Sequence, residues 1–172
     1  MSFEINCAPA TKTLSWTRVM PTEESISIIA ACAADYAWCA QLMASIKPWS
    51  TLQRDVYECK SALYRPASEL FLAHRGGQRL GLLLLQSHGL AGSPYIAAIA
   101  VVPEARGLGV GTAMLDFAEQ RYSQACNVFL CVSDFNTGAR ELYVRRGYEV
   151  VGELTDYVVT GHSELIMRKN LK

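Results

Sequence analysis

The chain has 172 residues, a mass of 18.9 kDa, 51% hydrophobic residues and a formal net charge of zero. This length predicts a single domain over residues 1–172, and neutrality argues against nucleic acid or an anionic membrane surface as a partner. No apolar run is long enough to span a membrane, and the first residues lack the basic and apolar stretches of a signal peptide. We therefore expect a cytoplasmic protein.

The cysteines and histidines give no sign of a disulfide framework or a metal site. Six cysteines are spread irregularly along the chain, without a C-x-x-C pair, and three histidines are scattered as well. Several cysteines lie inside apolar stretches, for example Cys131 within residues 129–132. Free, buried thiols are a simpler interpretation than three disulfides, and we expect no bound metal.

The N-terminal part of the chain predicts a tail, a strand and a helix. Residues 1–12 have no periodicity and are expected to form a loose tail, whereas residues 14–19 alternate as a first strand. Thr22 is a plausible N-cap for the alanine-rich run that follows. That run predicts a helix to Gln41, and a continuation to Ile46 is the alternative.

After this helix, breaks and apolar runs follow one another at short intervals. Pro48 ends the first helix, and Ser50 or Thr51 is expected to cap a second one that runs to Leu63. Further helices are expected at about residues 112–122 and at 137–146. Strands are expected at residues 69–74, 79–85, 95–102, 127–132, 148–154 and 164–168, with a hairpin at Gly76-Gly77, a C-cap at Gly147 and the last two strands antiparallel. This order predicts an α/β or α+β sandwich, in which helices cover one largely antiparallel sheet.

The most informative stretch joins a strand to a helix and reads Val101-Val-Pro-Glu-Ala-Arg-Gly-Leu-Gly-Val-Gly-Thr112. Gly107, Gly109 and Gly111 allow positive φ angles and let a ligand approach the backbone without meeting a Cβ. The free N–H groups and the dipole of the following helix add partial positive charge, and Arg106 adds a full one. Such a turn suits a phosphate or pyrophosphate, and the alternative is a glycine-rich connection that binds nothing.

Two common phosphate motifs do not fit this turn. The P-loop requires a lysine, but none occurs between Lys60 and Lys169. The dinucleotide fingerprint fails because Thr112 and Met114 occupy the two possible positions of its third glycine. What remains is Arg-Gly-x-Gly-x-Gly after a strand ending in Val-x-Pro, which resembles the coenzyme A loop of the GNAT family of N-acetyltransferases.

A second segment resembles the same family: Asn136-x-x-Ala139-x-x-Leu142-Tyr143-x-x-x-Gly147-Tyr148. The resemblance runs from about Trp16 to Met167 and implies a GNAT-like mixed, largely antiparallel sheet flanked by helices. It implies an enzyme that transfers an acetyl group from acetyl-CoA to a primary amine by direct attack in a ternary complex. Three classes of acceptor amine are open: a small molecule, a peptide N-terminus or a lysine. Acetyl-CoA is expected to bind at Ile99, Val101, Arg106, Gly107, Leu108, Gly109, Val110, Gly111, Thr112 and Asn136.

The chemistry of acetyl transfer gives these segments distinct tasks. An amine is mostly charged at neutral pH, so a group must accept its proton before it attacks. Backbone N–H groups of the strand ending at Val101 are suited to polarise the thioester carbonyl. The family resemblance implies that Tyr143 acts as general acid toward the leaving thiolate. The alternative for Tyr143 is simple packing in the core, on the apolar side of its helix.

A general base is not evident from the sequence. Many relatives carry a glutamate on the strand before the loop or on the next strand, where this chain has Ala97, Ala98 and Cys131. The remaining candidates are Glu69, Asp134, Asp156, His162 and Glu164. The missing carboxylates also fit a different class of protein, a non-catalytic module that binds acyl-CoA.

The identity of the acceptor is equally open. Ribosomal N-terminal acetyltransferases resemble this chain in Pro48-Trp49-Ser50, in the loop and in the closing strands, but they carry a carboxylate at the position of Cys131. This departure puts their substrate in doubt here. A homodimer, or a structural partner that binds through an apolar surface, is a further alternative.

Overall fold

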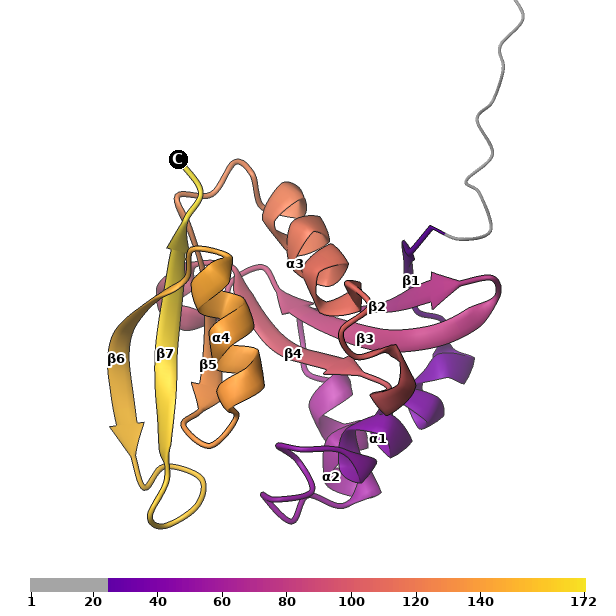
Figure 1. Cartoon of the computed structure of the whole chain (residues 1–172), viewed down its shortest axis with the longest axis horizontal. Coiled ribbons are helices and arrows are strands. Elements are labelled where there is room, and N and C mark those ends of the chain that lie inside the picture. Colours follow the sequence, from indigo (N-terminus) through magenta and orange to yellow (C-terminus); the bar gives the residue numbers. More distant parts are fainter. Residues whose placement is uncertain (1–24) are drawn as a thin grey trace, which may run out of the picture.

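Seven strands form one sheet in the order β1-β2-β3-β4-β5-β7-β6 in the computed structural model, which describes residues 25–172 (Figure 1). All neighbouring strands are antiparallel except β4 and β5, which are parallel. The strands are β1 (Ser27–Ala30), β2 (Ser68–Arg75), β3 (Gln78–Gln86), β4 (Tyr95–Val101), β5 (Asn127–Ser133), β6 (Glu149–Thr155) and β7 (Ser163–Asn170). The helices are α1 (Tyr36–Ser45), α2 (Val56–Leu63), α3 (Val110–Arg121) and α4 (Thr137–Arg145). The predicted fold class is confirmed, and the order of elements matches the prediction from the first helix onward.

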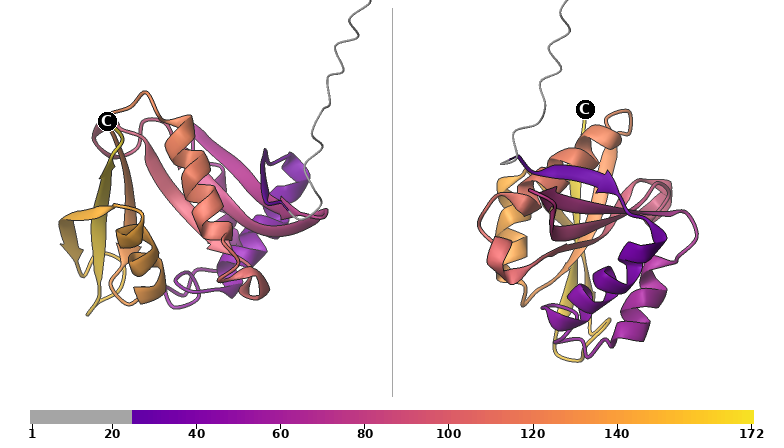
Figure 2. Two further views of the ribbon diagram at one scale, coloured as in Figure 1. Left: turned by 45° about the horizontal axis from the view of Figure 1, so that its top comes forward. Right: turned by 90° about the vertical axis from the view of Figure 1, so that its right-hand side faces the viewer.

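The inner strand β3 is covered on both faces. Leu82, Leu83, Leu84 and Leu85 are each at most 2% exposed. Leu82 and Leu84 pack in a core with α1 and α2, and Leu83 and Leu85 pack in a second core with α3. Figure 2 shows these helices on opposite faces of the sheet. A strand buried on both faces reads as a continuous apolar run, which explains the four consecutive leucines.

The predicted first helix is wrong over its first half. Residues 27–30 form β1, which pairs antiparallel with β2, and helical structure begins with a short 3-10 turn at Ala33–Asp35. Ile28 and Ile29 are β-branched and favour a strand, whereas the alanine-rich run begins only after them. The strand expected at residues 14–19 and the cap expected at Thr22 lie outside the described residues.

The predicted cap of the second helix is also wrong. Ser50 and Thr51 lie in a turn before α2, and the N-cap of α2 is Asp55. The Asp55 carboxylate accepts a hydrogen bond from the Glu58 amide (2.7 Å), and the Glu58 carboxylate accepts one from the Asp55 amide (3.1 Å). This reciprocal capping box satisfies two amides at the helix start, which a lone serine or threonine cap does not do.

The predicted turns are confirmed. Gly76 and Gly77 have φ angles of 54° and 77° and join β2 to β3 as a hairpin. Gly147, at φ 84°, follows α4 in the left-handed conformation typical of a helix C-cap. β6 and β7 are antiparallel, as expected, and the register of β6 shifts between Val150 and Gly152.

The five cysteines within residues 25–172 are free thiols. Cys39 and Cys59 are at most 2% exposed and belong to the core under α1 and α2, whereas Cys32 and Cys126 are exposed. The prediction of buried thiols therefore holds for only part of the set. In this part of the chain, no three His, Cys, Asp or Glu side chains converge as metal ligands, and no helix has the length and hydropathy to cross a membrane.

A charged cluster joins α3, the end of α4 and β7. The Glu119 carboxylate accepts hydrogen bonds from Arg146 (3.1 Å) and Lys169 (2.7 Å), and Arg146 also pairs with Asp116. The Glu119 side chain is 14% exposed, so water screens this cluster less than an ordinary surface pair. One carboxylate thus holds two cations from different elements at one place.

We expect Glu119→Gln to lower the free energy of unfolding by about 1–3 kcal/mol, because it leaves Arg146 and Lys169 side by side without the carboxylate. Urea denaturation followed by circular dichroism measures this change. Glu141→Gln is the matched control, since Glu141 forms only an exposed pair with Arg145 at 3.7 Å. The control should change stability by no more than about 0.5 kcal/mol, and equal losses in both variants would show that the cluster has no special role.

Candidate active site

The sheet opens between its two parallel strands. β4 and β5 pair only at Tyr95 with Phe129 and Ile96 with Leu130. Beyond Ile96 the strands diverge, as Figure 1 shows. Backbone N–H and C=O groups along the open edge of β4 then need other partners, and an extended ligand can supply them. A bulge lies at the same place, because Leu84 and Leu85 of β3 pair with Ala98 and Ile96 and skip the residue between them.

The glycine-rich turn leads from this open strand into α3. Gly107 and Gly109 have φ angles of 76° and 83°, a left-handed conformation that side chains with a Cβ rarely adopt. A Cβ on either residue would meet no heavy atom of the described protein within 4 Å. The turn is therefore held by its backbone angles and leaves open space above it. Gly109 is also the N-cap of α3, so the free amides of that helix begin at this turn.

The need for glycine at position 111 comes from packing and not from the backbone angle. Gly111 lies in the first turn of α3, and a Cβ there would come within 3.1 Å of Cδ2 of Leu142 on α4. Glycine at this position permits the close approach of the two helices. Among its neighbours, Val110 is 1% exposed and belongs to the core, so only its backbone can contact a ligand. Arg106 and Leu108 are exposed at the surface of the turn.

A cavity of about 830 Å³ lies beside the open strands. Its walls come from the segment between α1 and α2, from α2 itself, from β4 and β5, and from the residues around the β6–β7 connection. This volume lies in the range of small-molecule sites. Of the residues considered from the sequence, the cavity collects Trp49, Ala97, Ala98, Ile99, Cys131, Asn136, Tyr143 and Glu164. Val101 and the described residues of the glycine turn do not line it, so the turn and the cavity are two distinct parts of the site.

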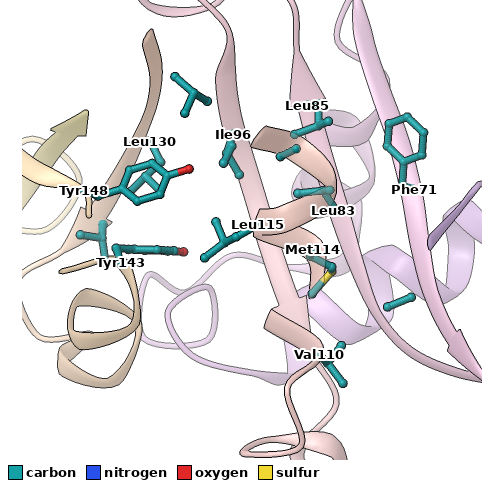
Figure 3. Close-up of a cluster of buried hydrophobic side chains, with 14 of the residues drawn as sticks. Phe71, Leu83, Leu85, Ile96, Val110, Met114, Leu115, Leu130, Tyr143 and Tyr148 are labelled. Atoms are coloured by element: carbon teal, nitrogen blue, oxygen red, sulfur yellow. The ribbon is translucent and has the colours of Figure 1, made fainter. Parts of the chain in front are cut away.

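Tyr143 projects from α4 and is 8% exposed. Burial raises the pKa of its hydroxyl to about 12, so the group keeps its proton at neutral pH and can donate it. Its ring lies 5.9 Å from that of Tyr148, which follows α4. Figure 3 shows the hydroxyls of both tyrosines pointing toward Leu115 and Ile96. Tyr143 lines the cavity and Tyr148 does not. The two interpretations of Tyr143, core packing and site residue, are thus compatible.

Asn136 stands at the N-cap of α4, but its side chain makes no capping hydrogen bond. Its backbone amide donates to the carbonyl of Ser133 (2.9 Å), which fixes the residue at the end of β5. An N-cap asparagine normally uses its side-chain oxygen for the first amides of the helix. Here that amide group is free for a ligand in the cavity.

Most of the proposed general bases lie elsewhere and have protein partners. Glu69 pairs with Arg121 of α3, and Asp156 accepts a hydrogen bond from the Gly161 amide (2.5 Å). Asp134 accepts from the Ser163 amide (3.1 Å) and lies 3.1 Å from Nδ1 of His162. Only Glu164 of this group lines the cavity.

Sequence reasoning missed Tyr95, Arg65 and Tyr157, which also line the cavity. Burial raises the pKa of the Tyr95 hydroxyl, and the nearby Cys131 thiol raises it further. Tyr95 could have been found from the alternation of β4, because it shares a face with Ala97 two residues later. Arg65 follows a helix and Tyr157 lies in a loop, so no periodic signal points to either.

The sequence profile of the acetyltransferase (GNAT) family matches residues 31–148, so the chain belongs to this family. Over 81 residues it is 37% identical to an uncharacterised N-acetyltransferase of Methanocaldococcus jannaschii, which covers 45% of this chain and 52% of that protein. The chain therefore spans about half the length of the curated relative that it matches.

Two solved structures share the fold. The Escherichia coli ribosomal-protein-S18-alanine N-acetyltransferase has a TM-score of 0.68 at 18% identity, covering 86% of this chain and 95% of that one. An aminoglycoside 6'-N-acetyltransferase crystallised with coenzyme A has a TM-score of 0.69 at 13% identity, covering 85% and 97%. At these identities the likeness shows the fold alone.

We expect Gly109→Val to abolish acetyl-CoA binding, because the side chain would fill the space above the turn and force the backbone out of its left-handed angle. Isothermal titration calorimetry with acetyl-CoA measures the loss. Gly77→Val is the matched control: its φ of 77° imposes similar strain, and a Cβ there also meets nothing within 4 Å, but it lies in the β2–β3 hairpin. The control should lose stability and keep its affinity. If Gly109→Val binds acetyl-CoA like the parent, the assignment of the turn is wrong.

Proposed function

We propose that this protein transfers an acetyl group from acetyl-CoA to a primary amine by direct attack within a ternary complex. One observation carries the proposal: the open edge of β4 leads at one end into a glycine turn with free space above it, and borders a cavity that contains Tyr143. Membership of the GNAT family supports the reaction class. The aminoglycoside acetyltransferase crystallised with coenzyme A supports the choice of co-substrate.

In this proposal, the turn and the strand divide the coenzyme between them. The backbone amides from Gly107 to Thr112 bind the pyrophosphate, with Arg106 as a flanking cation. The open backbone edge of β4 at Ile99 and Val101 pairs with the pantetheine arm as a further strand would. Asn136 binds the same arm from the opposite side of the opening.

The acetyl carbonyl then lies near backbone amides of β4, which polarise it for attack by the amine. Tyr143 donates the proton that the departing thiolate requires. With its raised pKa the hydroxyl is protonated at neutral pH, so the proton is in place when the thiolate forms beside it.

The acceptor enters through the cavity, whose walls include Trp49, Tyr57 and Tyr157. Aromatic walls and a volume of about 830 Å³ fit the amine of a small molecule or of a peptide end. The test is a mass-spectrometric screen of amine and peptide pools for a gain of one acetyl group that requires acetyl-CoA. No acetylated product from any pool, with acetyl-CoA binding intact, would contradict the proposal.

One observation favours a second candidate, a module that binds acyl-CoA without catalysis. The residues of β4 and β5 at the usual base positions, Ala97, Ala98 and Cys131, line the cavity and have no carboxylate. The same screen separates the two functions, since a module of this kind binds the coenzyme and acetylates nothing.

We expect Tyr143→Phe to lower kcat by about 10²–10⁴-fold, because it removes the proton donor while keeping the ring and its packing. Acetyl-CoA affinity and thermal stability should change little. Steady-state kinetics and calorimetry on the same preparation measure the two effects.

Tyr148→Phe is the matched control for this experiment. Tyr148 is 2% exposed, lies against Tyr143 and has a buried hydroxyl without a hydrogen-bond partner among the described residues. We expect this variant to keep its kcat. A Tyr143→Phe enzyme within about threefold of the parent, well short of the range for general acid catalysis, would show that Tyr143 only packs in the core.

A further inference from the structure

We infer that Glu164 of β7 is the residue that binds the ammonium group of the acceptor and takes its proton. The inference rests on the proposed acetyl transfer and supplies the base that β4 and β5 lack. Glu164 is half-buried, lines the cavity with Tyr143, and stands on a strand that is not adjacent to β4 in the sheet.

A hydrogen bond fixes one oxygen of this carboxylate. Glu164 lies opposite Ser133 in the β5–β7 register, and the Ser133 hydroxyl donates to its Oε1. Ser133 is 3% exposed, so water does not compete for this hydroxyl. Asp134 holds the backbone of Ser163, the residue before Glu164. Its amide donates to the Ser163 carbonyl (2.9 Å), and its carboxylate accepts from the Ser163 amide (3.1 Å). The Glu164 side chain is therefore held at a defined position in the wall.

The other oxygen of Glu164 is available. Within residues 25–172, Oε2 has no hydrogen-bond partner, and no lysine, arginine or histidine nitrogen lies within 4.0 Å of the carboxylate. The second carboxylate in the cavity wall, Glu58, is in the opposite situation. One of its oxygens pairs with Arg54 (2.9 Å) and the other accepts from the Asp55 amide (3.1 Å). Glu164 is thus the cavity carboxylate that lacks a cation.

The surroundings of Glu164 suit a base. Burial raises the pKa of its carboxyl, the Ser133 hydrogen bond lowers it and the charge of Asp134 raises it. Two other titratable groups nearby, Cys131 and Tyr95, have pKa values raised mainly by burial, so they stay neutral at pH 7. Arg65 lines the same cavity and forms no ion pair with Glu164. A half-buried carboxylate with a raised pKa accepts a proton more readily than an ordinary one.

The proton balance of the reaction then closes within the site. Glu164 takes one proton from the ammonium group, and the nitrogen lone pair forms the C–N bond at the acetyl carbonyl. The C–S bond breaks, and the thiolate takes the hydroxyl proton of Tyr143. The second proton leaves the new amide nitrogen and restores Tyr143, and Glu164 releases its proton to water. One acetyl group moves, and one proton is released for each ammonium acetylated.

The test measures kcat/KM for three probe amines, cadaverine, tyramine and the peptide amide Ala-Leu-Ala, in Glu164→Gln and the parent. We expect Glu164→Gln to lower kcat/KM by at least about 10²-fold at pH 7, with unchanged acetyl-CoA affinity. Glu153→Gln on the neighbouring strand β6 is the matched control, since Glu153 is exposed and does not line the cavity. It should leave kcat/KM unchanged.

The pH profile separates a base from a residue that only supports the fold. In the parent, kcat/KM should rise as Glu164 loses its proton, above the ordinary value of 4.5, and then stay level through neutral pH. In Glu164→Gln the level region should disappear, and the rate should rise about tenfold per pH unit toward the pKa of the amine. Ser133→Ala should move the rising limb to higher pH, because Ser133 lowers the pKa of Glu164.

A second readout does not depend on turnover. Cys131 is half-buried in the same cavity, so a bound amine should protect it from alkylation by N-ethylmaleimide, with exposed Cys32 as internal reference. We expect cadaverine, with coenzyme A present, to protect Cys131 in the parent and not in Glu164→Gln. Protection without any acetylation would overturn the proposed function and support Glu164 as the amine site. Activity in Glu164→Gln within threefold of the parent, or no protection and no acetylation with any probe, would overturn the inference.

Discussion

The separation of β4 from β5 is the constraint on which the rest of the structure depends. Two parallel neighbours that share only two register pairs cannot satisfy each other's backbone, so the sheet needs other means to stay whole. One of these is the second core, in which Ile96 of β4, Leu130 of β5 and Leu115 of α3 are all buried together. The opening is therefore a gap in hydrogen bonding that the packing of side chains spans on one face.

Glu164 is held differently from the carboxylates that pair with an arginine. Glu119, Glu58 and Asp35 each pair with an arginine, and each also accepts a further hydrogen bond. These groups organise helix starts and contacts between elements. Glu164 is held by a neutral serine instead, which orients the carboxylate without neutralising its charge. The carboxylate therefore keeps a negative charge in the cavity wall that no cation of residues 25–172 pairs with, and an incoming cation can pair with it.

The fold was more predictable from the sequence than the site. The hairpin at Gly76-Gly77 and the turn at Gly107 and Gly109 can be predicted from local sequence, because their positive φ angles favour glycine. The family resemblance pointed to Asn136 and Tyr143, which the structure brings to the cavity, although their roles stay predictions. Glu164 could only be one name among several, because its surroundings come from Ser133, 31 residues away, through a cross-strand register that no local pattern specifies.

The register shift in β6 affects whether two molecules of the protein can associate through this edge of the sheet. β6 ends the sheet, so its outer backbone edge has no strand from residues 25–172 beside it, and Val150 and Val151 are both about half exposed. A regular edge strand of this kind invites another chain to add to the sheet. The irregularity between Val150 and Gly152 interrupts the ladder, and exposed glutamates stand at positions 149 and 153. The broken spacing and the like charges at this edge both oppose the addition of a strand from another copy to β6.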